Sequence, residues 1–211
     1  MTDILNAISR DLDAYYTETL HRPGVAEQVG WKNEQAQRVR FEVLLDVITG
    51  SEAFSLNDLG CGLGTLADVL EARWGGGHDY RGYDIRADMI EGARRLHAGK
   101  PGRRFIPISN AGEMEPADYT VASGIFNLRA DLSDTAWMAY ILETLGHMNA
   151  ASRKGFSFNI LTKYSDADRM RPELYYADPC FFFDYCKRTF SRDVALRHDY
   201  REYDFTMIVR K

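Results

Sequence analysis

Short apolar runs and amphipathic stretches alternate along this chain from residue 55 onward. The run Ser55–Leu59 is predicted to be a strand, and Leu63, Leu66, Ala67 and Leu70 after it share one face of a helix. Further predicted strands cover residues 79–85, 103–108, 117–124 and 154–161, with helical patterns between them. Strands that alternate with helices usually pair in parallel, so the pattern predicts an α/β fold with a mostly parallel sheet.

The two ends of the chain depart from this alternation. Residues 194–200 and 203–210 predict two strands joined by a short turn, and such strands pair antiparallel as a hairpin. Residues 1–50 are mostly helical in pattern, with Asn33 as an expected N-cap. We therefore expect one domain, in which residues 1–50 form an N-terminal helical cap or lid and residues 51–211 form the core.

The most informative stretch follows the first strand. Asp58 precedes Gly60, Gly62 and Gly64, which are spaced two apart. Glycines permit a tight turn and the close approach of a ligand, and free N–H groups line a helix start. A dinucleotide fingerprint would require glycine where the chain has Thr65, and the Gly-Lys-Ser/Thr of a P-loop is absent. The stretch therefore predicts a nucleotide-type site that belongs to neither of these two classes.

The spacing Asp58-x-Gly60-x-Gly62-x-Gly64 resembles the first motif of class I S-adenosylmethionine (SAM) dependent methyltransferases. Asp84 ends the second predicted strand about 20 residues beyond the glycines, where a carboxylate for the ribose is expected. The closing hairpin also fits this family. The resemblance implies a Rossmann-like seven-stranded, mostly parallel sheet with a C-terminal antiparallel hairpin. It further implies SAM as the methyl donor and S-adenosylhomocysteine as the product.

The resemblance and the predicted strand ends assign further residues to the cofactor. A two-pronged guanidinium such as Arg40 is suited to grip the carboxylate of SAM, with an ordinary surface arginine as the alternative. Ser109 or Asn110 follows the third strand, where the family reads the adenine, although the family's usual acid is missing there. The expected cofactor-binding residues are Trp31, Arg40, Asp58, Gly60, Cys61, Gly62, Asp84, Ile85, Met89, Ser109, Asn110, Ser123 and Gly124.

The acceptor is expected at the carboxyl ends of the later strands, because open α/β sheets bind ligands there. Asn127 follows the fourth strand, and Tyr175 and Tyr176 lie in a long segment after the fifth, where insertions often carry function. A general base, needed only for a protonated acceptor, would be Asp131 or His198, with a structural histidine as the alternative for the latter. The expected catalytic residues are Asn127, Tyr175, Tyr176 and His198, and the expected acceptor contacts are Tyr15, Tyr16, Phe126 and Asn159.

Three functions fit these residues. The first is transfer of the sulfonium methyl of SAM to an O, N or S atom, or a carboxylate, of a small molecule. In the second, SAM is itself the substrate, and its own amine or carboxylate attacks, which releases methylthioadenosine by cyclisation or lysis. The third is a non-catalytic SAM-binding partner protein.

Composition narrows the partners. The net charge is −5, and basic residues occur as isolated pairs rather than as a stripe, which argues against a nucleic-acid substrate. No apolar run reaches the roughly 20 residues that cross a bilayer, and residues 1–10 lack a signal-peptide pattern. We therefore expect a cytoplasmic monomer or homodimer that binds no membrane. The chain has three cysteines, Cys61, Cys180 and Cys186, and they are not spaced as metal ligands are, so we expect no metal.

Overall fold

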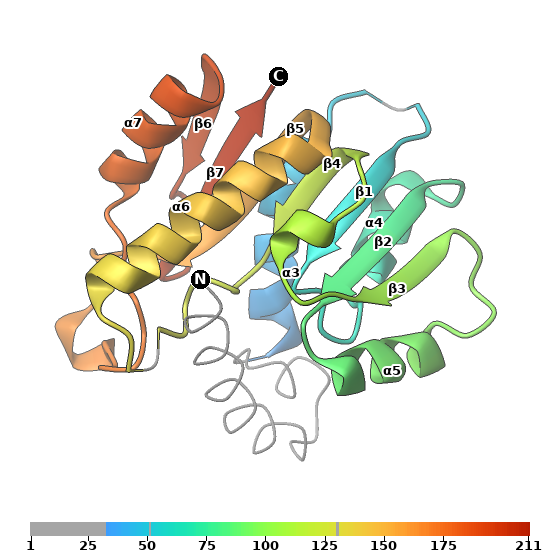
Figure 1. The fold of residues 1–211 in the computed structure, drawn as a ribbon, viewed down its shortest axis with the longest axis horizontal. Helices are drawn as coiled ribbons and strands as arrows, with labels where there is room; N and C mark the ends of the chain where they lie inside the picture. The colour runs from blue at the N-terminus through green and yellow to red at the C-terminus, as the bar shows by residue number, and fades with distance from the viewer. Residues whose placement is uncertain (1–32, 51, 130) are drawn as a thin grey trace.

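The computed structural model describes residues 33–50, 52–129 and 131–211. Within them, seven strands form one sheet in the order β3-β2-β1-β4-β5-β7-β6 (Figure 1). The strands are β1 Ser55–Leu59, β2 Asp79–Asp84, β3 Arg103–Pro107, β4 Ala117–Ala122, β5 Ser152–Leu161, β6 Asp193–Arg197 and β7 Asp204–Arg210. Strands β1 to β5 pair in parallel, whereas β7 runs antiparallel to both β5 and β6. The predicted fold, including the closing antiparallel hairpin, is confirmed.

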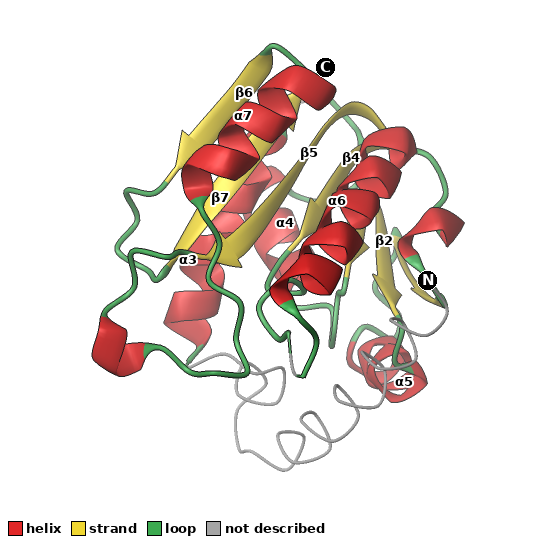
Figure 2. Ribbon diagram, turned by 60° about the vertical axis from the view of Figure 1, so that its left-hand side comes forward, coloured by secondary structure: helices red, strands yellow, loops and turns green. Residues whose placement is uncertain are grey.

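Helices cover both faces of the sheet. They are α3 Glu34–Leu44, α4 Leu66–Trp74, α5 Ala87–Leu96, α6 Asp134–Ala151 and α7 Pro179–Thr189. Short 3-10 helices are η1 Leu45–Val47, η2 Ala111–Glu113 and η3 Ala167–Arg169. Figure 2 shows α6 and α7 on the near face of the sheet, with α3 and α4 behind it.

Each face has its own apolar cluster. Trp137 of α6 and Phe182 of α7 pack with the sheet in the first cluster. Phe41 of α3, Leu66 of α4 and Ile90 of α5 pack in the second. The helical face predicted after β1 is buried, because its four residues are at most 6% exposed: Leu63, Leu66, Ala67 and Leu70. The hydrophobic pattern therefore identified the buried side of α4 correctly.

The N-terminal part of the described chain belongs to the core. The side chain of Asn33 accepts a hydrogen bond from the Ala36 N–H at 2.9 Å, so it caps α3 as predicted. Phe41 and Leu44 of this helix are buried in the second cluster. Residues 34–47 thus pack against the sheet as part of the core, and they do not belong to the lid that was expected over residues 1–50.

The strand order places the site. From β1 the sheet extends to β2 on one side and to β4 on the other, so the order of strands reverses between β1 and β4. In open α/β sheets, ligands bind outside the carboxyl ends of the strands at such a point. A ligand site is therefore expected at the loops after β1, β2 and β4.

Candidate functional site

The loop after β1 requires its glycines. Gly60, Gly62 and Gly64 have φ angles of 74°, 52° and 79°, a region that side chains with a β-carbon rarely adopt. A β-carbon at Gly60 would lie 2.2 Å from Cγ2 of Ile125, and one at Gly64 would lie 2.5 Å from the ring of Phe105. Both backbone conformation and space therefore demand glycine here.

Hydrogen bonds join this loop to the end of β2. The N–H groups of Gly60 and Cys61 both donate to the carbonyl oxygen of Tyr83, at 2.7 and 3.0 Å. The N–H of Gly62 donates to Oδ2 of Asp84 at 2.9 Å. The loop and the carboxylate thus converge at one place, as the sequence predicted, although these three N–H groups are already paired rather than free.

Asp84 has one backbone partner on each carboxylate oxygen. Its Oδ1 accepts from the Arg86 N–H at 3.0 Å, and its Oδ2 accepts from Gly62. Removal from water raises the pKa of this carboxyl, and the bonds from Arg86 and Gly62 oppose the rise. Ile85, the next residue, is 37% exposed and places an apolar side chain beside it. A carboxylate beside an apolar surface suits a ligand that carries both hydroxyl groups and a flat ring.

Asp58 lies beneath the loop. It is 2% exposed, and its Oδ2 accepts a hydrogen bond of 2.5 Å from the hydroxyl of Tyr80. Burial raises the pKa of Asp58 to about 7, and the nearby charge of Asp84 adds to the rise. The prediction of direct cofactor contact by the Asp58 side chain is therefore wrong, because that side chain faces the interior.

Two other predicted cofactor residues also have buried side chains. Cys61 is 8% exposed within the second cluster, and burial raises the pKa of its thiol well above the ordinary value. Met89, in the first turn of α5, is 2% exposed. Neither side chain presents a surface to a ligand, so a contact with the cofactor would have to come from the backbone of these residues and stays a prediction.

The loop after β3 uses its polar groups internally. Asn110 caps η2, since its Oδ1 accepts from the Gly112 N–H at 2.9 Å and its Nδ2 donates to Oε1 of Glu113 at 3.0 Å. The Ser109 N–H donates to the same oxygen at 3.2 Å. Glu113, which the sequence analysis did not single out, supplies the acceptor for both of these bonds. Asn110 is therefore a capping residue, and the exposed Ser109 stays a predicted adenine contact.

The end of β4 is held by β5. Asn159 is fully buried; its Oδ1 accepts from the Gly124 N–H at 2.7 Å, and its Nδ2 donates to the hydroxyl of Ser123 at 3.3 Å. Gly124 has a φ angle of 76°. The predicted acceptor contact by Asn159 is wrong, because both ends of its amide are used to shape the turn after β4. Ser123 and Gly124 are half-buried at that turn and stay predicted cofactor residues.

Asn127 and Phe126 also serve the scaffold. The Asn127 side-chain oxygen accepts from the Leu161 N–H at 3.1 Å, which ties the loop after β4 to the end of β5. Phe126 is fully buried in the first cluster, and its carbonyl accepts from the indole N–H of Trp137 at 2.9 Å. Direct acceptor contact by Phe126 is therefore excluded. Asn127 is half-buried and positions the loop through its side-chain oxygen, and its contact with the acceptor stays a prediction.

The two tyrosines after β5 lie in different environments. Tyr175 is 8% exposed and belongs to the first cluster, so its predicted catalytic contact is wrong. Tyr176 is half-buried, and its hydroxyl accepts from the Arg171 N–H at 2.9 Å. That bond fixes the segment between β5 and α7, and a catalytic role for Tyr176 stays a prediction.

His198 is distant from the glycine loop. It is exposed in the turn after β6, with its ring 6.1 Å from that of Tyr164. Strand β6 lies three places from β4 in the sheet, which at about 4.8 Å a strand is roughly 14 Å. His198 lies at the carboxyl edge of the sheet but far from β4, and its role as a base stays a prediction.

Arg40 is an internal ion-pair residue. Its Nε and Nη2 donate to the two carboxylate oxygens of Asp204 at 2.5 and 2.6 Å, and Glu202 lies 3.0 Å away. Its side chain is 8% exposed and that of Asp204 is fully buried. The prediction that Arg40 grips the cofactor is corrected: its fork binds Asp204 and ties α3 to the start of β7.

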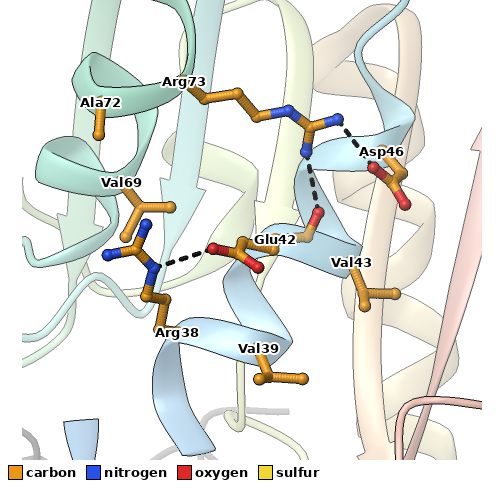
Figure 3. Close-up of a pocket in the computed structure, with 8 residues that line it drawn as sticks. All are labelled: Arg38, Val39, Glu42, Val43, Asp46, Val69, Ala72 and Arg73. Carbon is orange, nitrogen blue, oxygen red and sulfur yellow. Dashed lines mark hydrogen bonds and ion pairs between the residues drawn. The ribbon is translucent and has the colours of Figure 1, made fainter. Parts of the chain in front are cut away.

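One groove of about 460 Å³ lies elsewhere, between α3 and α4 (Figure 3). On the α3 wall, Arg38 pairs with Glu42, and Arg73 of α4 reaches across the groove to Asp46 of η1 at 2.9 Å (Figure 3). Its lining residues, none of them in a loop that follows a strand, are Arg38, Val39, Glu42, Val43, Asp46, Val69, Ala72 and Arg73. The groove is therefore separate from the glycine loop.

Tyr15, Tyr16 and Trp31 lie outside the described residues. Within the described part of the chain, no three His, Cys, Asp or Glu side chains gather as a metal site would require. In the same residues, no helix is both long and apolar enough to span a bilayer.

No protein-family model matches the chain. A Mycobacterium tuberculosis protein that is provisionally named a methyltransferase is 52% identical to it over 165 residues, which are 78% of this chain and 98% of that protein.

Two solved structures show the same fold at low identity. Magnesium protoporphyrin IX methyltransferase from Synechocystis PCC 6803, with bound S-adenosylhomocysteine, superposes with a TM-score of 0.68 at 12% identity, covering 98% of this chain and 99% of that one. Human N-acetylserotonin methyltransferase in complex with SAM has a TM-score of 0.58 at 17% identity, covering 98% of this chain and 65% of that one.

Proposed function

This chain belongs to the class I methyltransferases, and we propose that it moves the sulfonium methyl group of SAM to an O, N or S atom of a small molecule. The observation that carries the proposal is the 2.9 Å hydrogen bond between the Gly62 N–H and the Asp84 carboxylate. It brings the glycine loop and the predicted ribose-binding acid to one point beside the reversal of strand order.

The residues present fit an adenosyl group. A carboxylate accepts about four hydrogen bonds, and Asp84 receives one backbone N–H on each oxygen. Each oxygen therefore has capacity for a ribose hydroxyl. The exposed side chain of Ile85 offers an apolar surface for the adenine. Asp84 and Ile85 would hold the nucleoside, and the loop of Gly60 to Gly64 would lie against the rest of the cofactor.

The bound cofactor supplies a methyl group already activated by its sulfonium. The protein's part is to orient the acceptor and exclude water, and orientation alone can supply up to about 7–11 kcal/mol of the barrier. The turn after β4, shaped by Asn159 and Asn127, is the scaffold for that task. Of the two base candidates, the exposed Asp131 in the loop between β4 and α6 is the one near this turn. An acceptor that arrives deprotonated, such as a carboxylate or thiolate, would need neither.

The charge distribution supports a small acceptor. The formal net charge is −5, which disfavours a polyanionic substrate. The basic side chains beside the carboxyl ends of β5 and β6 are engaged by acids: Lys163 with Asp178, and Arg197 with Asp199. No stripe of open positive charge is available there within the described residues.

Calorimetric titration with SAM tests the proposal. The wild-type chain should bind SAM, and Asp84→Ala should weaken the affinity by about 100-fold or more, because each hydrogen bond to a charged group contributes about 1.5–3 kcal/mol. Asp193→Ala, at an exposed position of the edge strand β6, is the matched control and should leave binding unchanged. Equal binding by wild type and Asp84→Ala would refute the assignment.

Incubation with SAM alone separates the alternatives. A methyltransferase leaves SAM intact until an acceptor is added, whereas a cyclase or lyase releases methylthioadenosine at once. Methylthioadenosine in the mass spectrum would replace methyl transfer with the second chemistry. Binding without turnover, across a screen of small acceptors, would instead indicate a partner protein.

A further inference from the structure

A buried histidine touches the glycine loop from outside the predicted site. His97 ends α5, and its side chain is 4% exposed. Its Nε2 lies 3.2 Å from the carbonyl oxygen of Leu63, the residue between Gly62 and Gly64. A β-carbon at Gly64 would lie 3.0 Å from the same nitrogen, so the ring packs directly against the loop.

The position of Arg103 fixes the tautomer of His97. Nη1 of Arg103 lies 2.5 Å from Nδ1 of His97. A guanidinium can only donate hydrogen bonds, so Nδ1 must be the unprotonated nitrogen. The ring proton then sits on Nε2, from which it is donated to the Leu63 carbonyl. The neutral imidazole is thus the form that satisfies both neighbours.

Acids of α4 hold Arg103 in place. Its Nη1 also lies 2.6 Å from Oδ1 of Asp68, and its Nη2 donates to the carboxylate of Glu71. Lys100 approaches the same Asp68 oxygen at 2.8 Å. The network therefore runs from the outer side of α4 through β3 to the imidazole and ends on the backbone of the glycine loop.

We propose that His97 is a positioning residue for the cofactor site: held in its Nε2–H form by Arg103, it anchors the Leu63 carbonyl and so the loop that faces SAM. This inference rests on the proposed function, because the loop matters only if it binds the cofactor. His97 itself touches neither the cofactor nor the acceptor in this assignment.

The arrangement predicts a pH dependence. A second ring proton would have to sit on Nδ1, against the cation of Arg103 from β3 and near Lys100. Asp68 and Glu71 of α4 are the acids that face this cluster. Burial, more than any other cause, lowers the pKa of His97; the cations Arg103 and Lys100 lower it further, whereas Asp68 and the Leu63 carbonyl raise it. The contact between Arg103 and Nδ1 should therefore persist below the ordinary histidine range and be lost only at more acidic pH, whereas Nε2–H, which the imidazolium keeps, still donates to the Leu63 carbonyl.

Two variants and one control test this role in SAM titrations. His97→Leu removes the donor, and SAM affinity of the folded protein should fall tenfold or more. His97→Gln retains an N–H for Leu63, and affinity should recover to within about threefold of wild type. The control is His78→Leu, which replaces a half-buried histidine in the loop before β2 and should leave the SAM affinity unchanged. Unchanged affinity in His97→Leu, or equal losses in the Leu and Gln variants, overturns the proposal.

Nitrogen NMR of the imidazole separates this test from that of the proposed function, since it needs no cofactor. The wild type should show the Nε2–H tautomer of His97. Hydrogen exchange at the Gly64 amide, which donates to the Cys61 carbonyl at 2.9 Å, should accelerate in the Leu variant. An Nδ1–H tautomer or unchanged exchange rejects the positioning role, even if SAM binds. Failure of the wild type to bind SAM, with the tautomer and exchange as expected, rejects the proposed function instead and leaves the loop anchor standing.

Discussion

We expect the buried ion pair between Arg40 and Asp204 to make a large contribution to the stability of the fold, which Asp204→Asn tests. Asp204→Asn keeps the shape of the side chain but removes the charge that faces two guanidinium nitrogens at 2.5 and 2.6 Å. The Arg40 side chain is 8% exposed, and Glu202, its other acid neighbour, is 27% exposed. Removal of one partner from a buried pair costs about 3–5 kcal/mol. Glu202 still faces the Arg40 guanidinium at 3.0 Å in this variant, so the upper value is a limit here.

The expected shift in melting temperature follows from chain length. An unfolding entropy of about 2.1 cal/mol/K per residue, over 211 residues, gives roughly 7–11 °C for this loss. Arg40→Met should have a similar effect. Because an apolar pair can replace a buried ion pair at little cost, Arg40→Met with Asp204→Leu should lose much less than the sum of the single changes.

Urea and thermal unfolding, followed by circular dichroism, measure these values. Asp184→Asn breaks the exposed pair between Arg188 and Asp184 on α7, and it should leave the melting temperature unchanged. The reasoning fails if Asp204→Asn loses less than about 1 kcal/mol, or if the two single losses add fully in the double variant.

Three further changes test the site's scaffold. Gly60→Ala should destabilise the fold by at least about 1–2 kcal/mol because of its positive φ angle alone. Gly76 has open space around it, so Gly76→Ala should be nearly neutral in the same urea titration. Similar losses of stability in both variants would contradict the steric account. Asp58 has a folded-state pKa of about 7, raised from an ordinary value of 3.8. Between these two pH values the folded state binds a proton that the unfolded state has lost. The free energy of unfolding therefore falls as pH rises through that window, by up to about 1.4 kcal/mol per pH unit. Asp58→Asn should remove that slope from the pH profile of unfolding, and an unaltered profile would show that the group titrates normally. Asn159→Leu leaves the Gly124 N–H without its acceptor and should lower the stability of the fold by about 1–3 kcal/mol. Thermal unfolding and SAM titration measure the effect. If neither stability nor SAM affinity falls, the turn after β4 does not depend on Asn159.

Much of the fold follows from local rules in the sequence. The N-cap Asn33 was predicted from residue type and position, and it accepts the expected backbone hydrogen bond. The apolar spacing identified the buried face of α4. The closing hairpin was predicted from two adjacent strand patterns, and β6 and β7 pair accordingly. Each of these signals lies within a few residues along the chain.

The errors have a common cause. Asn159 lies near the end of β5 and Tyr175 lies in the segment after it, so the sequence places both near the acceptor. Their side chains nevertheless bond or pack against neighbouring elements, since a buried amide must satisfy its polar groups wherever a partner lies. Position along a strand does not reveal such partners.

The glycine spacing and the acid after β2 were enough to locate the cofactor loop, because a turn with positive φ angles and a carboxylate at a strand end are local requirements of the chain. Only the tertiary structure decided which side chains remain available beside that loop. Asp204 lies 164 residues from the arginine that it binds, and His97 reaches the loop from the far end of α5. Long-range packing and charge pairing determine such contacts, and they depend on where the elements meet rather than on any pattern within one of them.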